Sequence, residues 1–185
     1  AWYENNGASD PSWSAHTIST SGDKINEVFA ADMDGDGDMD IIVSSGDDTI
    51  YWYENSGATD PSWTAGEVAT VVGIVSVFAA DMDGDGDMDI VSASIDNDII
   101  AWHENDGSVN PSWTVSDISA DADGAENVFV ADMDGDGDMD IISASRFDDT
   151  IAWYENDGNT DPSWTASDIA TSADYAMAVF AADMD

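Results

Sequence analysis

The chain has 185 residues, and its 41 Asp and Glu side chains against 2 Lys and Arg give a formal net charge of −39 at pH 7. This balance excludes nucleic-acid binding through phosphate neutralisation and does not suit an anionic membrane surface. Hydrophobic residues still make up 43% of the chain, including 8 Trp, so we expect a folded protein with a core. There is no Cys, which excludes disulfides and thiolate metal sites and leaves oxygen ligands for any metal.

The sequence is built from repeats of 49 to 51 residues, which is the length of propeller and array repeats. Trp-Tyr-Glu-Asn recurs along the chain, once as a His variant, and so do Pro-Ser-Trp and Val-Phe. The repeated strings begin at Trp2, Trp52, Trp102 and Trp153, at Pro11, Pro61, Pro111 and Pro162, and at Val28, Val77, Val128 and Val179. The chain begins at Ala1 with no Met or leader, so we expect that a leader was removed or that these residues are a segment of a longer protein.

Each repeat contains four short segments that favour β-strands. In chain order, one repeat shows them at 140–144, 151–156, 164–169 and 178–182, separated by turn residues such as Asp157-Gly158. Each segment is too short for a typical helix and has the length of a strand. Four strands in about 50 residues are typical of a propeller blade.

We therefore predict an all-β fold, a β-propeller of four-stranded antiparallel blades, with about 3.7 repeats in a chain that starts and ends inside a blade. The whole chain, 1–185, would form one repeat domain. Within it we expect strands 3 and 4 of a partial blade at 1–27, complete blades at 28–76, 77–127 and 128–178, and the first strand of another partial blade at 179–185.

The string DMDGDGDMD occurs three times and begins a fourth time at the end of the chain. Carboxylates at positions 1, 3, 5, 7 and 9 repel one another by about 1 kcal/mol per close pair in water, so the loop needs a cation to close. Oxygen ligands in a flexible loop suit Ca²⁺, and Gly at position 6 permits the sharp turn. A solvated acidic turn is the alternative, whereas an EF-hand lacks its Glu at position 12, where Val43, Ser92 and Ser143 stand.

We expect calcium to be bound by the side chains at positions 1, 3, 5 and 9 and by the backbone carbonyl at position 7, whose side chain faces water. Three complete sites follow, with a fourth incomplete at the C-terminus. The residues are Asp32, Asp34, Asp36, Asp38 and Asp40; Asp81, Asp83, Asp85, Asp87 and Asp89; Asp132, Asp134, Asp136, Asp138 and Asp140; and Asp183 and Asp185.

The run Val-Phe-Ala-Ala-Asp-Met-Asp-Gly-Asp-Gly-Asp-Met-Asp-Ile-Ile, with Ile-Ala-Trp-Tyr-Glu-Asn-Asp-Gly later in the repeat, resembles the FG-GAP/VCBS repeats of extracellular bacterial proteins. Those repeats are similar to the calcium-binding blades of the integrin α-chain propeller. The resemblance implies that the acidic loop joins the first two strands of a blade and holds Ca²⁺ at one rim, in a secreted or surface-attached protein. The chain departs from that pattern because it holds fewer than four full repeats, where family propellers usually have about seven blades.

Other repeated residues have structural interpretations. We expect the paired Trp of each repeat to pack between blades, and His103 to replace the Tyr found there in other repeats. His16 is interpreted as an exposed, variable position. A repeated hydrogen bond to a neighbouring loop is expected for one Glu per repeat, at Glu4, Glu54, Glu104 and Glu155.

The sequence favours an extracellular, calcium-stabilised structural or adhesive module and not an enzyme, because no nucleophile and base recur together. The alternative is a carbohydrate-binding propeller, which would make glycans its partners. Exposed terminal strands invite pairing, so the module is either part of a longer propeller, a small four-blade ring, or the protomer of a surface fibre. We expect self-association or a continued repeat array, with no nucleic acid bound and no membrane insertion.

Overall fold

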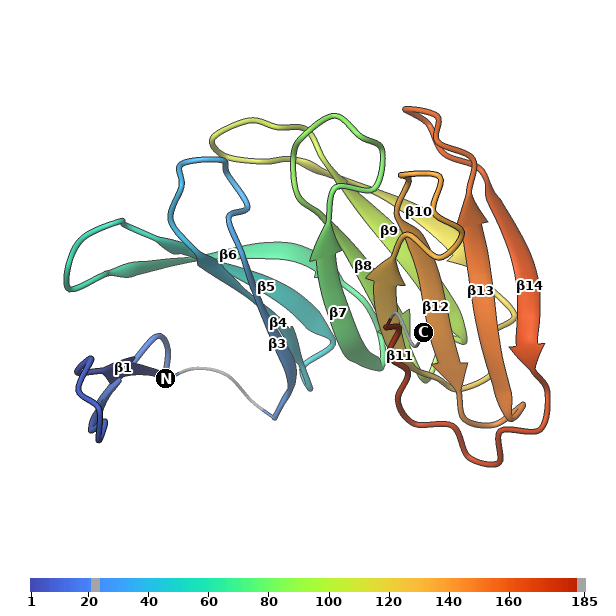
Figure 1. Ribbon diagram of the computed structural model, residues 1–185, viewed down its shortest axis with the longest axis horizontal. Coiled ribbons are helices and arrows are strands. Elements are labelled where there is room, and N and C mark those ends of the chain that lie inside the picture. Colours follow the sequence, from blue (N-terminus) through green and yellow to red (C-terminus); the bar gives the residue numbers. More distant parts are fainter. Residues whose placement is uncertain (21–23, 183–185) are drawn as a thin grey trace.

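A computed structural model describes residues 1–20 and 24–182, and every regular element in these residues is a β-strand (Figure 1). A two-stranded hairpin is followed by three four-stranded antiparallel sheets, each in chain order, which confirms the predicted all-β blades. Within the described residues there is thus no helix that could cross a membrane. The hairpin contains β1 (Trp2–Asn5) and β2 (Trp13–His16); the blades contain β3 (Ile25–Ala31), β4 (Asp40–Ser45), β5 (Thr49–Asn55) and β6 (Trp63–Thr70); β7 (Ile74–Ala80), β8 (Asp89–Ser94), β9 (Ile99–Asn105) and β10 (Trp113–Ser119); and β11 (Ala125–Ala131), β12 (Asp140–Ser145), β13 (Thr150–Asn156) and β14 (Trp164–Ala170).

The sheets stand side by side in an open arc, and their first strands are neighbours: β7 lies between β3 and β11 (Figure 1). The acidic loop joins the first and second strands of each blade, and these loops share the upper rim of the view. A tight turn joins the second and third strands, with φ between 57° and 64° at Asp48, Asp98 and Asp149. Asp tolerates this left-handed conformation better than most residues.

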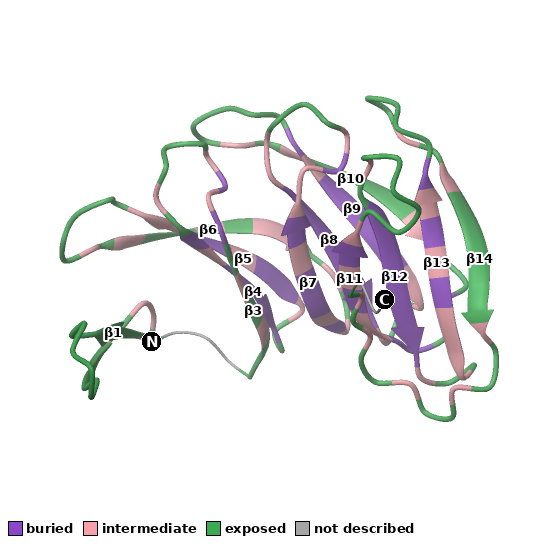
Figure 2. Ribbon diagram, in the orientation of Figure 1, coloured by how far each residue is buried: buried purple, intermediate pink, exposed green. Residues whose placement is uncertain are grey.

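The hydrophobic cores lie between the blades. One buried cluster joins the first and second complete blades, and another joins the second and third. Along β8, Ile90 belongs to the first cluster and Val91 to the second, because successive strand residues point to opposite faces of the sheet. The middle blade is therefore the most buried part of the molecule (Figure 2).

A column of phenylalanines runs across the first strands. Phe29, Phe78, Phe129 and Phe180 are each in contact with the next, with ring centroids 4.5, 5.1 and 4.7 Å apart in chain order. The rings are tilted or edge-on, the arrangements that aromatic pairs prefer. One residue of each Val-Phe string thus connects all four repeats.

The two ends of the arc are incomplete blades. The hairpin pairs Asn5 with Trp13, the register with which Asn55 meets Trp63 in the first complete blade, so it corresponds to a third and a fourth strand. At the other end, residues 179–182 form no paired strand, unlike the expected first strand at 179–185, whose last three residues lie outside the described part of the chain. In the complete blades, the first strand pairs with the strand that follows the acidic loop.

Candidate metal centres

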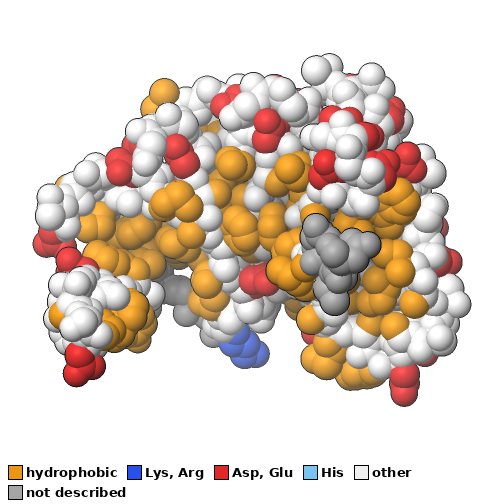
Figure 3. All heavy atoms as spheres, viewed as in Figure 1, with side chains coloured by type: hydrophobic (Ala, Val, Ile, Leu, Met, Phe, Trp, Pro, Cys, Tyr) orange, Lys and Arg blue, Asp and Glu red, His pale blue; other side chains and the backbone are white. Residues whose placement is uncertain are grey.

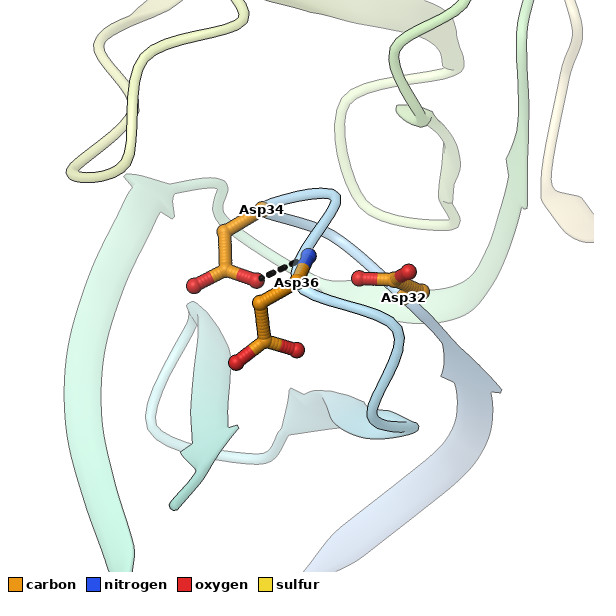
Figure 4. Close-up of side chains that lie close together, drawn as sticks. All are labelled: Asp32, Asp34 and Asp36. Atoms are coloured by element: carbon orange, nitrogen blue, oxygen red, sulfur yellow. Dashed lines mark hydrogen bonds between the residues drawn. The ribbon is translucent and has the colours of Figure 1, made fainter. Parts of the chain in front are cut away.

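Three carboxylate triplets lie at the start of the acidic loops, one in each complete blade. Their ligand atoms all lie within 4.8 Å of one another. Two oxygens on opposite sides of a Ca²⁺ ion are about 4.6–5.2 Å apart, so the spacing suits one shared ion. Figure 4 shows the first triplet, which comes from a single loop. The triplets are Asp32, Asp34 and Asp36; Asp81, Asp83 and Asp85; and Asp132, Asp134 and Asp136.

Hydrogen bonds within the loop hold each triplet in place. In the first loop, Gly37 N donates to Asp32 Oδ2 at 2.9 Å, Asp36 N to Asp34 Oδ1 at 3.2 Å, and Asp38 N to Asp36 Oδ1 at 2.8 Å. The second and third loops repeat all three bonds. Gly37 has a φ of 94°, which confirms that position 6 needs glycine for the turn.

The residues present fit a cation. Asp32 Oδ1 is buried and has no hydrogen-bond partner among the described residues, a costly state for a carboxylate oxygen unless a positive ligand reaches it. Burial raises the pKa of Asp34 above its ordinary value, and repulsion from neighbouring carboxylates raises it further. Asp83 shows the same direction of pKa shift for the same reasons. A divalent cation bound by oxygen ligands would relieve both the missing partner and the repulsion.

The Asp at position 9 is bound to its own blade. Asp40, which is 1% exposed, accepts hydrogen bonds from Met33 N at 3.1 Å and Trp52 Nε1 at 2.9 Å on Oδ2, and from Asn55 N at 2.8 Å on Oδ1. Burial raises the pKa of its counterpart Asp89 to about 7. Asp40 Oδ1 accepts a single bond and keeps a second lone pair, so its role as a fourth ligand stays a prediction, as do the same roles of Asp89 and Asp140.

The expectation that the side chain at position 7 faces water is only partly met. Asp38 is half-buried and its carboxylate packs against Gly57 in the loop between the third and fourth strands, so closely that a methyl group on Gly57 would collide with it. Asp87 and Asp138 pack in the same way against the corresponding glycines. The glycine therefore permits this close approach, which the sequence pattern did not indicate.

Asp183 and Asp185, the expected ligands of the incomplete fourth site, lie outside the described residues.

A side chain that the sequence analysis did not single out connects neighbouring loops. Asn105, the last residue of β9, donates from Nδ2 to Met88 O of its own loop at 3.0 Å and to Met33 O of the preceding loop at 2.9 Å. Asn156 repeats this with Met139 O and Met82 O. The recurrence of Asn at the end of each Trp-Tyr-Glu-Asn string was the signal that could have revealed it.

The other repeated residues have mixed outcomes. Among the described residues, Glu54, Glu104 and Glu155 have no side-chain hydrogen bond in their blades, so the expected bond to a neighbouring loop is absent. Glu4 instead pairs with His16 Nε2 at 3.3 Å, and His16 stacks on Trp2 and is only partly exposed.

His103 and part of the Trp set agree with their structural interpretation, whereas Trp13 is 59% exposed and lies outside the clusters between blades. Trp113 and Trp164 pack against the clusters between blades. His103 occupies the buried Tyr position, where its Nε2 lies 2.9 Å from Ser92 Oγ.

A row of four-stranded blades, each with an acidic loop after its first strand, defines a repeat protein of the propeller type. A comparison with protein-family models matches the FG-GAP-like repeat over residues 1–43, 41–92, 81–143 and 133–185. These ranges cover the whole chain, which therefore belongs to the FG-GAP repeat family and confirms the resemblance seen in its sequence. A search of curated proteins found no match.

Proposed function

We propose that this protein is a calcium-stabilised structural or adhesive repeat module that works outside the cell. The observation that carries the proposal is the threefold recurrence of one carboxylate triplet, with the same internal hydrogen bonds, along one rim of the arc. Acidic side chains gather along that rim (Figure 3). Three similar sites in a row serve the stability of the row and not a single reaction centre.

The proposed place of action follows from affinity. Loops of this kind in extracellular modules bind Ca²⁺ with a Kd of about 10⁻⁴–10⁻³ M, which millimolar extracellular calcium fills. At about 1 mM calcium, a site with a Kd of about 10⁻⁴ M stabilises the folded state by about 1.4 kcal/mol. Calcium also offsets part of the net charge of −39, which otherwise opposes a compact fold.

The geometry gives less support to the other functions. Four of the eight Trp side chains take part in the packing between blades, which leaves them little free surface for a sugar; they are Trp52, Trp102, Trp113 and Trp164. Arg146 is held by Glu126 at 3.2 Å and lies over the rings of Phe147 and Tyr175, and His103 is buried, so neither is placed to act on a substrate. We therefore keep the proposal that the module is not an enzyme.

The test is calcium binding measured together with thermal unfolding. Isothermal titration calorimetry should give three sites per chain, and the melting temperature should fall in excess EDTA and recover when calcium is restored. Asp36→Asn should remove one site, because position 5 belongs to the triplet. Asp60→Asn makes the same charge change on an exposed loop and should leave three sites. Melting that is unaffected by EDTA, or equal site counts in the two variants, would contradict the proposal.

A further inference from the structure

The first face of the arc exposes residues that are buried at the junctions inside the chain. Val28 is 60% exposed, whereas Val77 and Val128, at the same blade position, are 1% and 3% exposed. Ile25 is 47% exposed and its counterpart Ile74 is 1% exposed. The residue types and the strand positions correspond, and the difference is that a two-stranded hairpin lies before β3 in the described residues, where a four-stranded sheet lies before β7 and β11.

The last face of the arc exposes the complementary positions. Phe180, at the end of the phenylalanine column, is 74% exposed and contacts one neighbouring ring among the described residues, that of Phe129. Met133 is 38% exposed, whereas Met33 is 2% and Met82 is 1% exposed. The carbonyls of Met33 and Met82 each accept a hydrogen bond from an Asn side chain of the following blade. No side-chain amide among the described residues reaches Met133 O.

A hollow lies at each face. Hydrophobic side chains gather between the hairpin and the first complete blade and on the last blade (Figure 3). The first hollow, of about 270 Å³, separates the hairpin from the first complete blade, and the second, of about 630 Å³, lies beside the last blade. The first is lined by Trp2, Ile25, Val28, Ile41 and Tyr53. The second is lined by Met133, Ile142, Ile151, Ile169 and Phe180.

We propose that these two faces are one interface, on which a second copy of this chain docks head to tail. Residues 179–182 of one copy fill the hollow beside the hairpin of the next copy, and that hairpin covers the last blade of the first copy. Phe180 then lies against Phe29 of the next copy and continues the phenylalanine column. The shared blade takes its first strand from one copy and its third and fourth strands from the other, and its second-strand position stays open. This inference rests on the proposed structural function and names its partner.

The hairpin already holds the amide that such docking requires. Asn5 Oδ1 accepts a hydrogen bond from Gly7 N at 2.9 Å, as Asn105 and Asn156 do from their own glycines at 3.0 Å. This bond orients the side chain so that Nδ2 points toward the preceding blade at the two internal junctions. In the docked pair, Asn5 donates to Met133 O of the other copy, which completes the pattern seen inside the chain. Repetition of one head-to-tail contact builds a ring or a filament.

Cross-linking between copies tests the interface, because the chain has no Cys of its own. Phe180→Cys and Val28→Cys are made in separate chains, mixed at equal concentration in millimolar calcium and 150 mM NaCl, and treated with a short thiol–thiol cross-linker. We expect cross-linked dimers in the mixture, at least fivefold more than with either variant alone. Both substituted side chains are exposed, so neither variant is expected to unfold. Val109→Cys, on an exposed loop, replaces Val28→Cys in the matched control.

Two results would overturn the interface. The first is a mixture that cross-links no better than the Val109→Cys control. The second is a chain carrying both Phe180→Cys and Val28→Cys that cross-links only within itself, which would mean ring closure by one chain. Calcium titration of the same samples separates this inference from the proposed function: three filled sites without cross-linking contradict only the docking, and cross-linking without calcium binding contradicts only the calcium-stabilised module.

Discussion

The amide of Asn105 allows the contribution of the contact between two neighbouring acidic loops to stability to be measured. Asn105→Ala removes the hydrogen bonds to Met88 O in its own loop and to Met33 O in the preceding loop. Asn105 is buried, so water does not readily replace the lost amide. Asn55 is the matched control, because among the described residues its Nδ2 donates only to Met39 O of its own loop, and the residue is half-buried.

The difference between the two substitutions isolates the bond that crosses the junction. Both remove the bond within the loop and the bond from the following glycine amide. Only Asn105→Ala also leaves the buried carbonyl of Met33 without its donor, and an unsatisfied buried acceptor costs about 1–3 kcal/mol. We therefore expect Asn105→Ala to lower the free energy of unfolding by about 2 kcal/mol more than Asn55→Ala.

Urea unfolding followed by Trp fluorescence, at a fixed millimolar calcium concentration, measures both losses. The slopes of the transitions must agree with that of the wild type for the free energies to be compared. Asn156→Ala should repeat the larger loss, because its amide reaches Met82 O across the next junction. Equal losses for Asn105→Ala and Asn55→Ala would refute the reasoning, since the bond across the junction would then contribute nothing measurable.

Three further predictions concern a buried histidine, a core position and a loop glycine. Burial lowers the pKa of His103 to about 4, so as the pH falls below 6.5 this side chain takes up a proton in the unfolded chain but not in the folded chain. Between pH 7 and pH 5 the wild type should therefore lose about 2 kcal/mol more free energy of unfolding than His103→Tyr in urea titrations. Equal losses would assign the pH dependence to other groups. Ile90→Ala should lower the free energy of unfolding by about 2–5 kcal/mol and Ile41→Ala by clearly less, because Ile90 is fully buried and Ile41, at the same strand position, is partly exposed. Similar urea midpoints for the two variants would mean that the first face is covered in solution. Gly37→Ala, at a φ of 94° with open space around it, should weaken calcium binding at the first loop alone in calorimetry, and three unchanged sites would show that the turn is not needed for binding.

The sequence was sufficient to predict the strands and the loops because both are local properties. Alternating apolar residues between Asp-Gly and Asn-Gly turns define a strand without reference to the rest of the chain. The carboxylates at positions 1, 3 and 5 meet because one glycine-containing loop supplies all of them. The repeat itself then ensured that a pattern found once applied to each blade.

The features that the sequence did not reveal depend on contacts between distant segments. The carboxylate of Asp38 meets Gly57 only because the loop after the third strand folds back onto the acidic loop. The amide of Asn156 meets Met82 O, 74 residues earlier, only because two blades stack in a particular register. Repetition shows that such residues matter to the fold, but it does not show which of them are partners.

These contacts also explain why calcium binding and blade packing should be coupled. Asp40 connects its loop to the blade, since it accepts hydrogen bonds from Met33 N beside the triplet and from Trp52 Nε1 in the core. Met33 O in turn accepts a hydrogen bond from the side-chain amide of Asn105 in the next blade. An ion that orders one loop therefore orders the acceptor on which the next junction depends. Because the stability of a repeat array is approximately a sum of local and nearest-neighbour terms, calcium bound at one loop should stabilise the adjoining blade as well as its own, and should affect more distant blades far less.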